Sequence, residues 1–146
     1  MFVDYSEIFL HKSWDWLNDQ EIKELTMTPN FTKEQQYIFF DSLSNRTNYF
    51  IKGIVYDSVL IGVCGLKNIT EQDGEYWGYI GEKNYWGKGI GIDIIDFIIE
   101  KAKQLNLKSL YLNVSDANIR AQRLYLKKGF DVESRNGGVI KMTRTI

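Results

Sequence analysis

The sequence has one cysteine, one histidine and one proline among its 146 residues, and these scarcities exclude several kinds of site. Cys64 has no second cysteine with which to form an internal disulfide or a CxxC redox pair. Zinc sites built from four cysteines, or from two cysteines and two histidines, are excluded because His11 is the only histidine. We expect no bound metal, and we expect Cys64, within an apolar segment, to be a small core residue.

Long apolar runs and an excess of one charge are also absent. Charged residues interrupt every apolar stretch well before the roughly 20 residues that a membrane span needs. The N-terminus carries Asp4 where a secretory signal would be basic, so the sequence predicts a cytoplasmic protein. The 18 Lys and Arg residues almost balance the 19 Asp and Glu residues. We therefore expect neither a nucleic acid nor a membrane as a partner.

The remaining features indicate one folded domain with an uneven distribution of charge. Aromatic residues make up 14% of the chain, which disfavours disorder, and no linker or repeat divides it. Residues 1–73 hold 11 acidic and 6 basic residues, whereas residues 74–146 hold 8 acidic and 12 basic residues. This split suits a polyanionic ligand held by the second half and a cationic one received near the first, or it is scatter over a solvated surface.

Hydrophobic periodicity predicts the helices and strands. Apolar residues recur at helical spacing in the first third, and Thr32 and Gln35 have the form of a capping box. In the middle of the chain, β-branched and aromatic residues between turn signals predict an antiparallel meander. The expected helices are residues 6–17, 19–25, 32–43, 90–105 and 118–128, and the expected strands are residues 48–56, 59–68, 75–80, 109–114, 130–133 and 139–143.

This order of elements predicts an α/β (α+β) fold with a mixed, mostly antiparallel central sheet flanked by helices. The strand–helix–strand unit of residues 75–114 must place its two strands parallel, with a right-handed crossover between them.

The segment of residues 85–91, Tyr-Trp-Gly-Lys-Gly-Ile-Gly, joins a strand to the long amphipathic helix. Its glycines allow a ligand to approach the backbone, and free amides in the first helical turn attract an anion such as phosphate. A Walker A loop is excluded because Lys88 precedes Gly89 and no hydroxyl residue follows. A Rossmann loop is disfavoured although Asp116 follows the next strand, because an antiparallel meander precedes the glycines. A purely structural turn is the remaining alternative.

Two segments together resemble the GNAT superfamily of acetyl-coenzyme A-dependent N-acetyltransferases. Residues 86–91 are similar to its Q/R-x-x-G-x-G/A pyrophosphate loop, with Trp86 in place of Gln or Arg. Residues 118–130 are similar to its N-x-x-A-x-x-x-Y-x-x-x-G-F helix. The W-G-K-G variant resembles the subgroup that includes ribosomal-protein N-terminal acetyltransferases. The full first strand of the family is not expected at the start of this chain.

The resemblance implies that acetyl-CoA binds in a slot between two central parallel strands that splay apart. Backbone groups of Ile80 and Gly81 would pair with the pantetheine arm, and the glycine loop would hold the phosphates. Asn118 would cap its helix, contact the coenzyme, or do both. The implied coenzyme-binding residues are Ile80, Gly81, Trp86, Gly87, Lys88, Gly89, Ile90, Gly91, Ile92, Asn113, Asn118 and Tyr125.

Two residues are candidates for catalysis. The resemblance places Tyr125 beside the coenzyme sulfur, where its hydroxyl would donate to the departing thiolate; helix packing is the alternative. Glu75 shares one side of its strand with Tyr79 by the period-2 rule and is the candidate base, directly or through water. Glu82 and His11 are alternatives for the base, although a solvated surface position is the simpler interpretation of each carboxylate.

The expected function is acetyl transfer from acetyl-CoA to a primary amine in a ternary complex. A single domain, residues 1–146, would use residues 48–146 as its coenzyme-binding core and residues 1–47 as acceptor-side helices. The latter look like the start of GNAT enzymes that acetylate nucleotide-linked amino sugars, so an amino sugar or another small amine is the expected acceptor. A protein N-terminus, or a non-catalytic acyl-CoA sensor, is the alternative. A homodimer is compatible with the sequence.

Overall fold

The computed structural model describes residues 1–146, and all the predicted helices and strands are present, with ends within a few residues of those expected. In chain order the elements are β1 (Phe2–Asp4), α1 (Glu7–Asn18), α2 (Gln20–Leu25), α3 (Lys33–Ser42), η1 (Leu43–Asn45), β2 (Phe50–Tyr56), β3 (Val59–Lys67), β4 (Asp73–Ile80), η2 (Lys83–Tyr85), α4 (Ile90–Gln104), β5 (Ser109–Ser115), α5 (Ile119–Lys127), β6 (Asp131–Asn136) and β7 (Val139–Thr145).

Strand β1 was not among the expected strands, and it shows that a short first strand of three residues is present where a full one was not expected. Three residues pair antiparallel with β2, with Phe2 opposite Ile54. The ring of Phe2 stacks on Phe97 of α4 at 3.9 Å between centroids. A strand of three residues is too short to show a period-2 pattern, so its pairing depends on tertiary contacts that the local sequence does not reveal.

Local sequence accounts for the ends and faces of the main helices. The predicted capping box of α3 is present: the Gln35 N–H donates to Thr32 Oγ1 at 3.1 Å, and the Thr32 N–H donates to Gln35 Oε1 at 2.9 Å. Helix α4 buries the apolar stripe predicted from its spacing, formed by Ile90, Ile94, Ile95, Ile98, Ile99 and Ala102.

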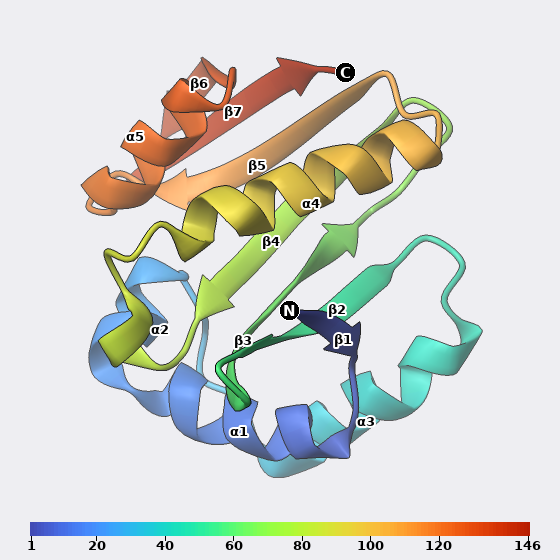
Figure 1. Ribbon diagram of the computed structural model, residues 1–146, viewed down its shortest axis with the longest axis vertical. Helices are drawn as coiled ribbons and strands as arrows, with labels where there is room; N and C mark the ends of the chain where they lie inside the picture. The colour runs from blue at the N-terminus through green and yellow to red at the C-terminus, as the bar shows by residue number, and fades with distance from the viewer.

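The strands form one seven-stranded sheet in the order β1-β2-β3-β4-β5-β7-β6 (Figure 1). Every neighbouring pair is antiparallel except β4 and β5, which are parallel and joined through α4. The predicted meander and the predicted parallel pair are therefore confirmed.

The sheet opens at its parallel pair. Strand β4 pairs with β5 only from Asp73 to Glu75, opposite Ser109 to Tyr111. Beyond that point β4 continues beside β3 as far as Ile80, and β5 continues beside β7 as far as Ser115. The facing edges of β4 and β5 thus diverge, which confirms the predicted splay.

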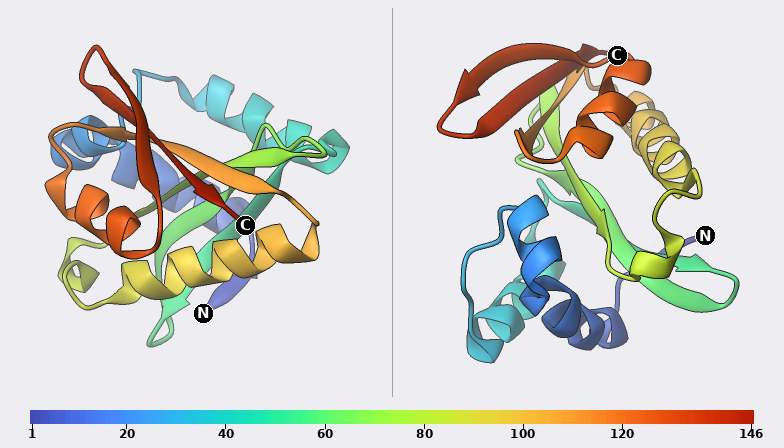
Figure 2. Two further views of the ribbon diagram at one scale, coloured as in Figure 1. Left: turned by 90° about the horizontal axis from the view of Figure 1, so that it is seen from above. Right: turned by 90° about the vertical axis from the view of Figure 1, so that its left-hand side faces the viewer.

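Helices cover both faces of the sheet (Figure 2). Helices α4 and α5 lie on one face, and α1, α2 and α3 lie on the other. The larger core lies beneath α4 and includes Leu110 and Met142, whereas a smaller one beneath α1 and α2 is formed by Phe9, Trp16, Ile22 and Val63. The opening between β4 and β5 connects these two faces. None of the helices combines the length and apolar character needed to cross a membrane.

Candidate active site

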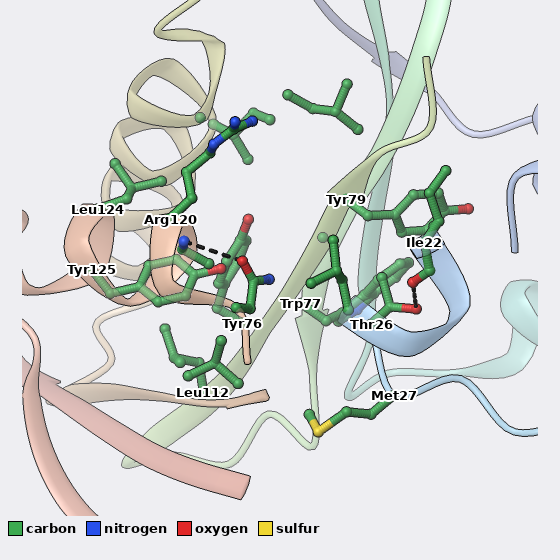
Figure 3. A pocket seen from close by; sticks show the side chains of 18 of the residues that line it. Ile22, Thr26, Met27, Tyr76, Trp77, Tyr79, Leu112, Arg120, Leu124 and Tyr125 are labelled. Carbon is green, nitrogen blue, oxygen red and sulfur yellow. Dashed lines mark hydrogen bonds between the residues drawn. The ribbon is translucent and has the colours of Figure 1, made fainter. Parts of the chain in front are cut away.

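A cleft of about 740 Å³ lies where β4 and β5 diverge. Figure 3 shows Leu124 and Tyr125 of α5 on one side, and Ile22, Thr26 and Met27 of the segment around α2 on the other. The aromatic side chains of β4 lie between these two walls. One continuous space therefore reaches from the glycine loop to the acceptor-side helices.

One end of the cleft is formed by the glycine loop and the first turn of α4. Gly87 and Gly89 have φ angles of +73° and +80°, and added Cβ atoms would meet nothing within 4 Å. The backbone N–H groups of residues 87–91 donate no hydrogen bond to other backbone groups in the loops and helix caps. The N–H groups in the first turn of a helix also have no hydrogen-bond partner within that helix. These free N–H groups and the positive end of the helix dipole form an anion-binding cradle.

Arg120 of α5 adds a cation to this end. Its guanidinium lies 5.9 Å from the ring centroid of Trp86, the side chain is exposed, and no ion pair includes it. It is the only arginine that lines the cleft. Sequence reasoning did not single out Arg120, although it stands two residues after the motif's Asn118.

The coenzyme-binding residues implied by the sequence mostly line this cleft. Gly81 and Lys88 do not: an added Cβ at Gly81 would meet the Trp16 ring, and the Lys88 ammonium lies over the Tyr85 ring at 5.6 Å. The Gly81 N–H donates to the Ile61 carbonyl in β3 at 2.6 Å. The residues that line the cleft are Ile80, Trp86, Gly87, Gly89, Ile90, Gly91, Ile92, Asn113, Asn118 and Tyr125.

Trp86 and Asn118 have well-defined structural contacts of their own. The Trp86 indole Nε1 donates to the Ile80 carbonyl at 2.8 Å, which ties the loop to the open edge of β4. The Ala121 N–H donates to Asn118 Oδ1 at 3.3 Å. Asn118 is therefore the N-cap of α5, which is one of the two roles expected for it.

Tyr125 lies inside the cleft, against the aromatic residues on the α5 side of the sheet. Its ring packs edge-to-face on the Tyr76 ring, with 6.0 Å between centroids, and its centroid lies 5.9 Å from that of the Phe130 ring. Burial raises the pKa of Tyr125 to about 12. The phenol is therefore protonated throughout the ordinary pH range, and its hydroxyl can donate a hydrogen bond within the cleft.

Glu75 also lines the cleft, and hydrogen-bond donors surround its carboxylate. Asn68 Nδ2 donates to Oε1 and Asn113 Nδ2 donates to Oε2, both at 3.1 Å. The Lys67 ammonium lies 3.8 Å from Oε2, and the Glu75 side chain is only 13% exposed. The carboxylate is thus fixed at the edge of the paired part of β4, on the face opposite Tyr76.

The other candidate bases lie away from the cleft. Glu82 accepts a hydrogen bond from Trp16 Nε1 at 2.9 Å. His11 lies on the exposed side of α1, where its Nε2 is 3.6 Å from Glu7 Oε1. Neither lines the cleft. Cys64 is buried in the core as expected, and burial raises the pKa of its thiol to about 12.

The acceptor-side wall contains residues that the sequence did not single out as a group. Trp77 and Tyr79 project from β4 on the same face as Glu75, and the Tyr79 hydroxyl donates to Ser13 Oγ at 2.9 Å. Opposite them lies the segment of residues 25–29, in which Met27 has a left-handed φ of +56°. The period-2 spacing of Glu75, Trp77 and Tyr79 in the sequence indicates that these side chains share one face of the sheet. No local pattern indicates the left-handed turn at Met27.

The fold and this cleft define a mixed α/β protein with a splayed parallel strand pair and an anion-binding turn. Residues 11–130, most of the chain, match the model of the Acetyltransferase (GNAT) family, and the chain therefore belongs to that family. It is similar to a protein described as a probable spermine N(1)-acetyltransferase from Bacillus subtilis subsp. natto (strain BEST195). The two are 31% identical over 86 residues, which are 53% of this chain and only 57% of that relative.

Solved structures share the fold. The spermidine N-acetyltransferase from Vibrio cholerae, in complex with CoA and spermine, has a TM-score of 0.88 and 20% identity over 99% of this chain and 94% of that one. The N-acetyltransferase PseH from Campylobacter jejuni, in complex with acetyl coenzyme A, has a TM-score of 0.74 and 19% identity over 97% and 92% of the two chains.

Proposed function

We propose that this protein transfers the acetyl group of acetyl-CoA to a primary amine. The observation that carries the proposal is that one cleft brings together the free amides of the glycine loop, a half-buried tyrosine and a carboxylate. Family membership supports the acetyl chemistry. The complexes of similar folds with acetyl coenzyme A and with CoA support the choice of acetyl donor.

The residues at the glycine-loop end of the cleft fit a coenzyme with phosphates. The amides of residues 87–91 and the Arg120 guanidinium would hold the pyrophosphate, with Trp86 fixing the loop against Ile80. The pantetheine arm would run along the open edge of β4, past Gly78. Because the Gly81 N–H already donates to Ile61, we assign pantetheine contacts to Ile80 rather than to the Gly81 amide.

Acetyl transfer replaces a C–S bond by a C–N bond, and two protons must be handled. When bound, acetyl-CoA would supply the activated acetyl thioester. The amine would give up a proton to Glu75, the one carboxylate that lines the cleft, directly or through a water molecule. The departing thiolate would accept a hydrogen bond from the Tyr125 hydroxyl and would take up a proton from solvent water, which balances the proton lost by the amine. A pKa of about 12 for Tyr125 exceeds the roughly 8.5 of a thiol, so stabilisation by a hydrogen bond is favoured over full proton transfer from the phenol.

Three classes of primary amine are candidate acceptors. The acceptor-side segments resemble those of amino-sugar acetyltransferases, a relative is described as acting on spermine, and the Trp86-to-Gly89 loop resembles that of enzymes acting on protein N-termini. Release of free thiol from acetyl-CoA, measured with glucosamine, spermine, a short peptide with a free N-terminus and 2-phenylethylamine as a simple primary amine, compares them. Turnover of any amine supports the proposal. Tight binding of acetyl-CoA without turnover of any amine contradicts it and favours an acyl-CoA sensor.

A further inference from the structure

The charge of the cleft restricts which amine can enter it, provided that the proposed acetyl transfer is correct. Three charged residues line the cleft: Lys67, Glu75 and Arg120. Arg120 lies at the phosphate end and Lys67 lies beside Glu75, so the acceptor end offers one carboxylate with a cation already near it. An amine with several ammonium groups would find one counter-charge there.

The acidic residues of the N-terminal half add no further negative charge to the cleft. Asp19 and Glu21 of the α1–α2 region form ion pairs with Lys83 at 2.9 and 3.0 Å. Asp15 and Glu24 are exposed, and none of these four carboxylates lines the cleft. The net negative charge of residues 1–73 is therefore directed to the surface and not toward the amine.

The walls of the acceptor end are apolar and partly aromatic. Of the 31 residues that line the cleft, 19 are hydrophobic. Those at the acceptor end come from α1, α2 and the segment after α2 on one side, and from β4 and the residue before β2 on the other: Leu17, Ile22, Leu25, Met27, Pro29, Tyr49, Trp77 and Tyr79. The Tyr79 hydroxyl is already bonded to Ser13 Oγ, and the Tyr49 ring lies against Trp77 at 6.0 Å between centroids.

The segment that carries Met27 is held in place by its own hydrogen bonds. Thr26 Oγ1 donates to the Ile22 carbonyl at 2.7 Å, and the Thr28 N–H donates to the Lys23 carbonyl at 3.0 Å. Figure 3 shows the Met27 side chain extending from this segment toward the middle of the cleft. Met27 is 38% exposed, so its flexible thioether lies on the solvent side of the cleft, where it can adapt to the shape of an apolar ligand.

We infer that the acceptor is a primary amine with a single positive charge, carried on an apolar body that bears an aromatic ring. Its ammonium lies at Glu75, and its ring lies among Trp77, Tyr79 and Met27. Polyamines are poor acceptors because a second ammonium group would lose water without meeting a carboxylate. Amino sugars are poor acceptors because most of their hydroxyl groups would find no partner: Thr26 Oγ1, Thr28 Oγ1 and Asn113 Nδ2 are already engaged within the chain, and only Trp77 Nε1 is left without one.

Steady-state acetylation of 2-phenylethylamine, spermine and glucosamine tests this inference. We expect kcat/KM for 2-phenylethylamine to exceed that for spermine by about 100-fold or more, the discrimination that one unpaired buried charge supports. An equal or higher value for spermine or glucosamine overturns the inference while the proposed acetyl transfer stands. If acetyl-CoA binds and no amine is acetylated, the proposed function itself fails and the inference falls with it.

A variant at Met27 tests the charge argument directly. Met27→Glu adds a second carboxylate to the acceptor end, and we expect it to raise kcat/KM for spermine and lower it for 2-phenylethylamine, each by about 10-fold. Ile38→Glu is the matched control, because Ile38 is 62% exposed on α3 and does not line the cleft. Unchanged preference in Met27→Glu, with acetyl-CoA binding retained, contradicts the assignment of this wall to the acceptor.

Discussion

Tyr125 is the residue whose environment says most about the chemistry of the cleft. Burial keeps its phenol protonated, which suits the proposed role of donating a hydrogen bond to the departing sulfur. We expect Tyr125→Phe to lower kcat by about 100-fold, the lower end of what a positioned acid contributes, with KM for acetyl-CoA nearly unchanged. Tyr56→Phe is the control, since Tyr56 does not line the cleft. A Tyr125→Phe variant with wild-type kcat would remove Tyr125 from the mechanism.

The same pKa fixes how activity should depend on pH. With its pKa near 12, Tyr125 does not ionise between pH 6 and pH 10. We therefore expect that no fall in kcat below about pH 11 is due to Tyr125. Comparing the pH profiles of kcat for wild type and Tyr125→Phe is the measurement. A falling limb near pH 9 that disappears in the variant would contradict this assignment.

Arg120 provides a test of the phosphate end that leaves the chemistry untouched. A charge-assisted hydrogen bond to phosphate at an exposed position supports about a 10-fold effect. We expect Arg120→Ala to raise KM for acetyl-CoA by that factor, and to leave KM for acetyl-pantetheine, which has no phosphate, unchanged. Arg123→Ala is the matched control, because Arg123 is exposed on the same helix but does not line the cleft. Equal losses in both variants would show only a general charge effect.

At the scale of the element, the junction between η2 and α4 depends on backbone conformations that favour glycine. Gly89 is the N-cap of α4 with φ of +80°, a conformation that a β-branched residue adopts only with strain. We expect Gly89→Val to lose most of its affinity for acetyl-CoA, measured by titration calorimetry. Gly137→Val carries similar strain, with φ of +57° in the β6–β7 turn, and should keep its affinity. Tight binding by Gly89→Val would remove the basis for placing the phosphates on this loop.

The elements themselves were largely predictable from the sequence. The stripe from Ile90 to Ala102 and the capping box at Thr32 are local signals, and both are present as predicted. The site was only partly predictable, because the two motifs give positions along the chain but not what faces them. The turn at Met27 is held by local hydrogen bonds to Lys23 and Glu24 but has no glycine to mark it, and Asn113 reaches Glu75 from a strand 38 residues further along the chain. No local pattern carries that information.

At the scale of the whole molecule, the structure separates the two interpretations of the uneven charge that the sequence left open. Arg120 comes from the positive half and lies where phosphates are proposed to bind. The acidic half, however, contributes no carboxylate to the cleft, because Glu75 belongs to the other half. Surface scatter therefore accounts for the acidic N-terminal half, and the charge balance alone does not predict a polycationic acceptor.

Buried neutral groups make the stability of the whole fold sensitive to alkaline pH. Burial raises the pKa of Cys64, Tyr5 and Tyr125 to about 12, from ordinary values of 9.0 for the thiol and 10.0 for the phenols. Each neutral group stabilises the fold fully below its unfolded pKa, and this contribution is lost as the pH rises from that value toward 12.

We therefore expect the free energy of unfolding, measured by urea titration, to fall steadily from about pH 9 upward. In Cys64→Ala the fall should begin nearer pH 10, because only the tyrosines remain to ionise. The comparison uses the onset of the fall and not the absolute stability, which loss of the buried sulfur also lowers. A free energy of unfolding that stays constant from pH 9 to pH 11 would contradict this linkage.

The central claim is that this cleft moves an acetyl group from sulfur to nitrogen. The most direct test uses acetyl-CoA labelled with ¹³C in the acetyl group, incubated with the protein and 2-phenylethylamine, spermine or glucosamine, followed by mass spectrometry of the amines. The account predicts labelled acetyl on the nitrogen of an amine, with an equal amount of CoA released. Absence of labelled product from every amine, with folded protein that binds acetyl-CoA, would contradict it.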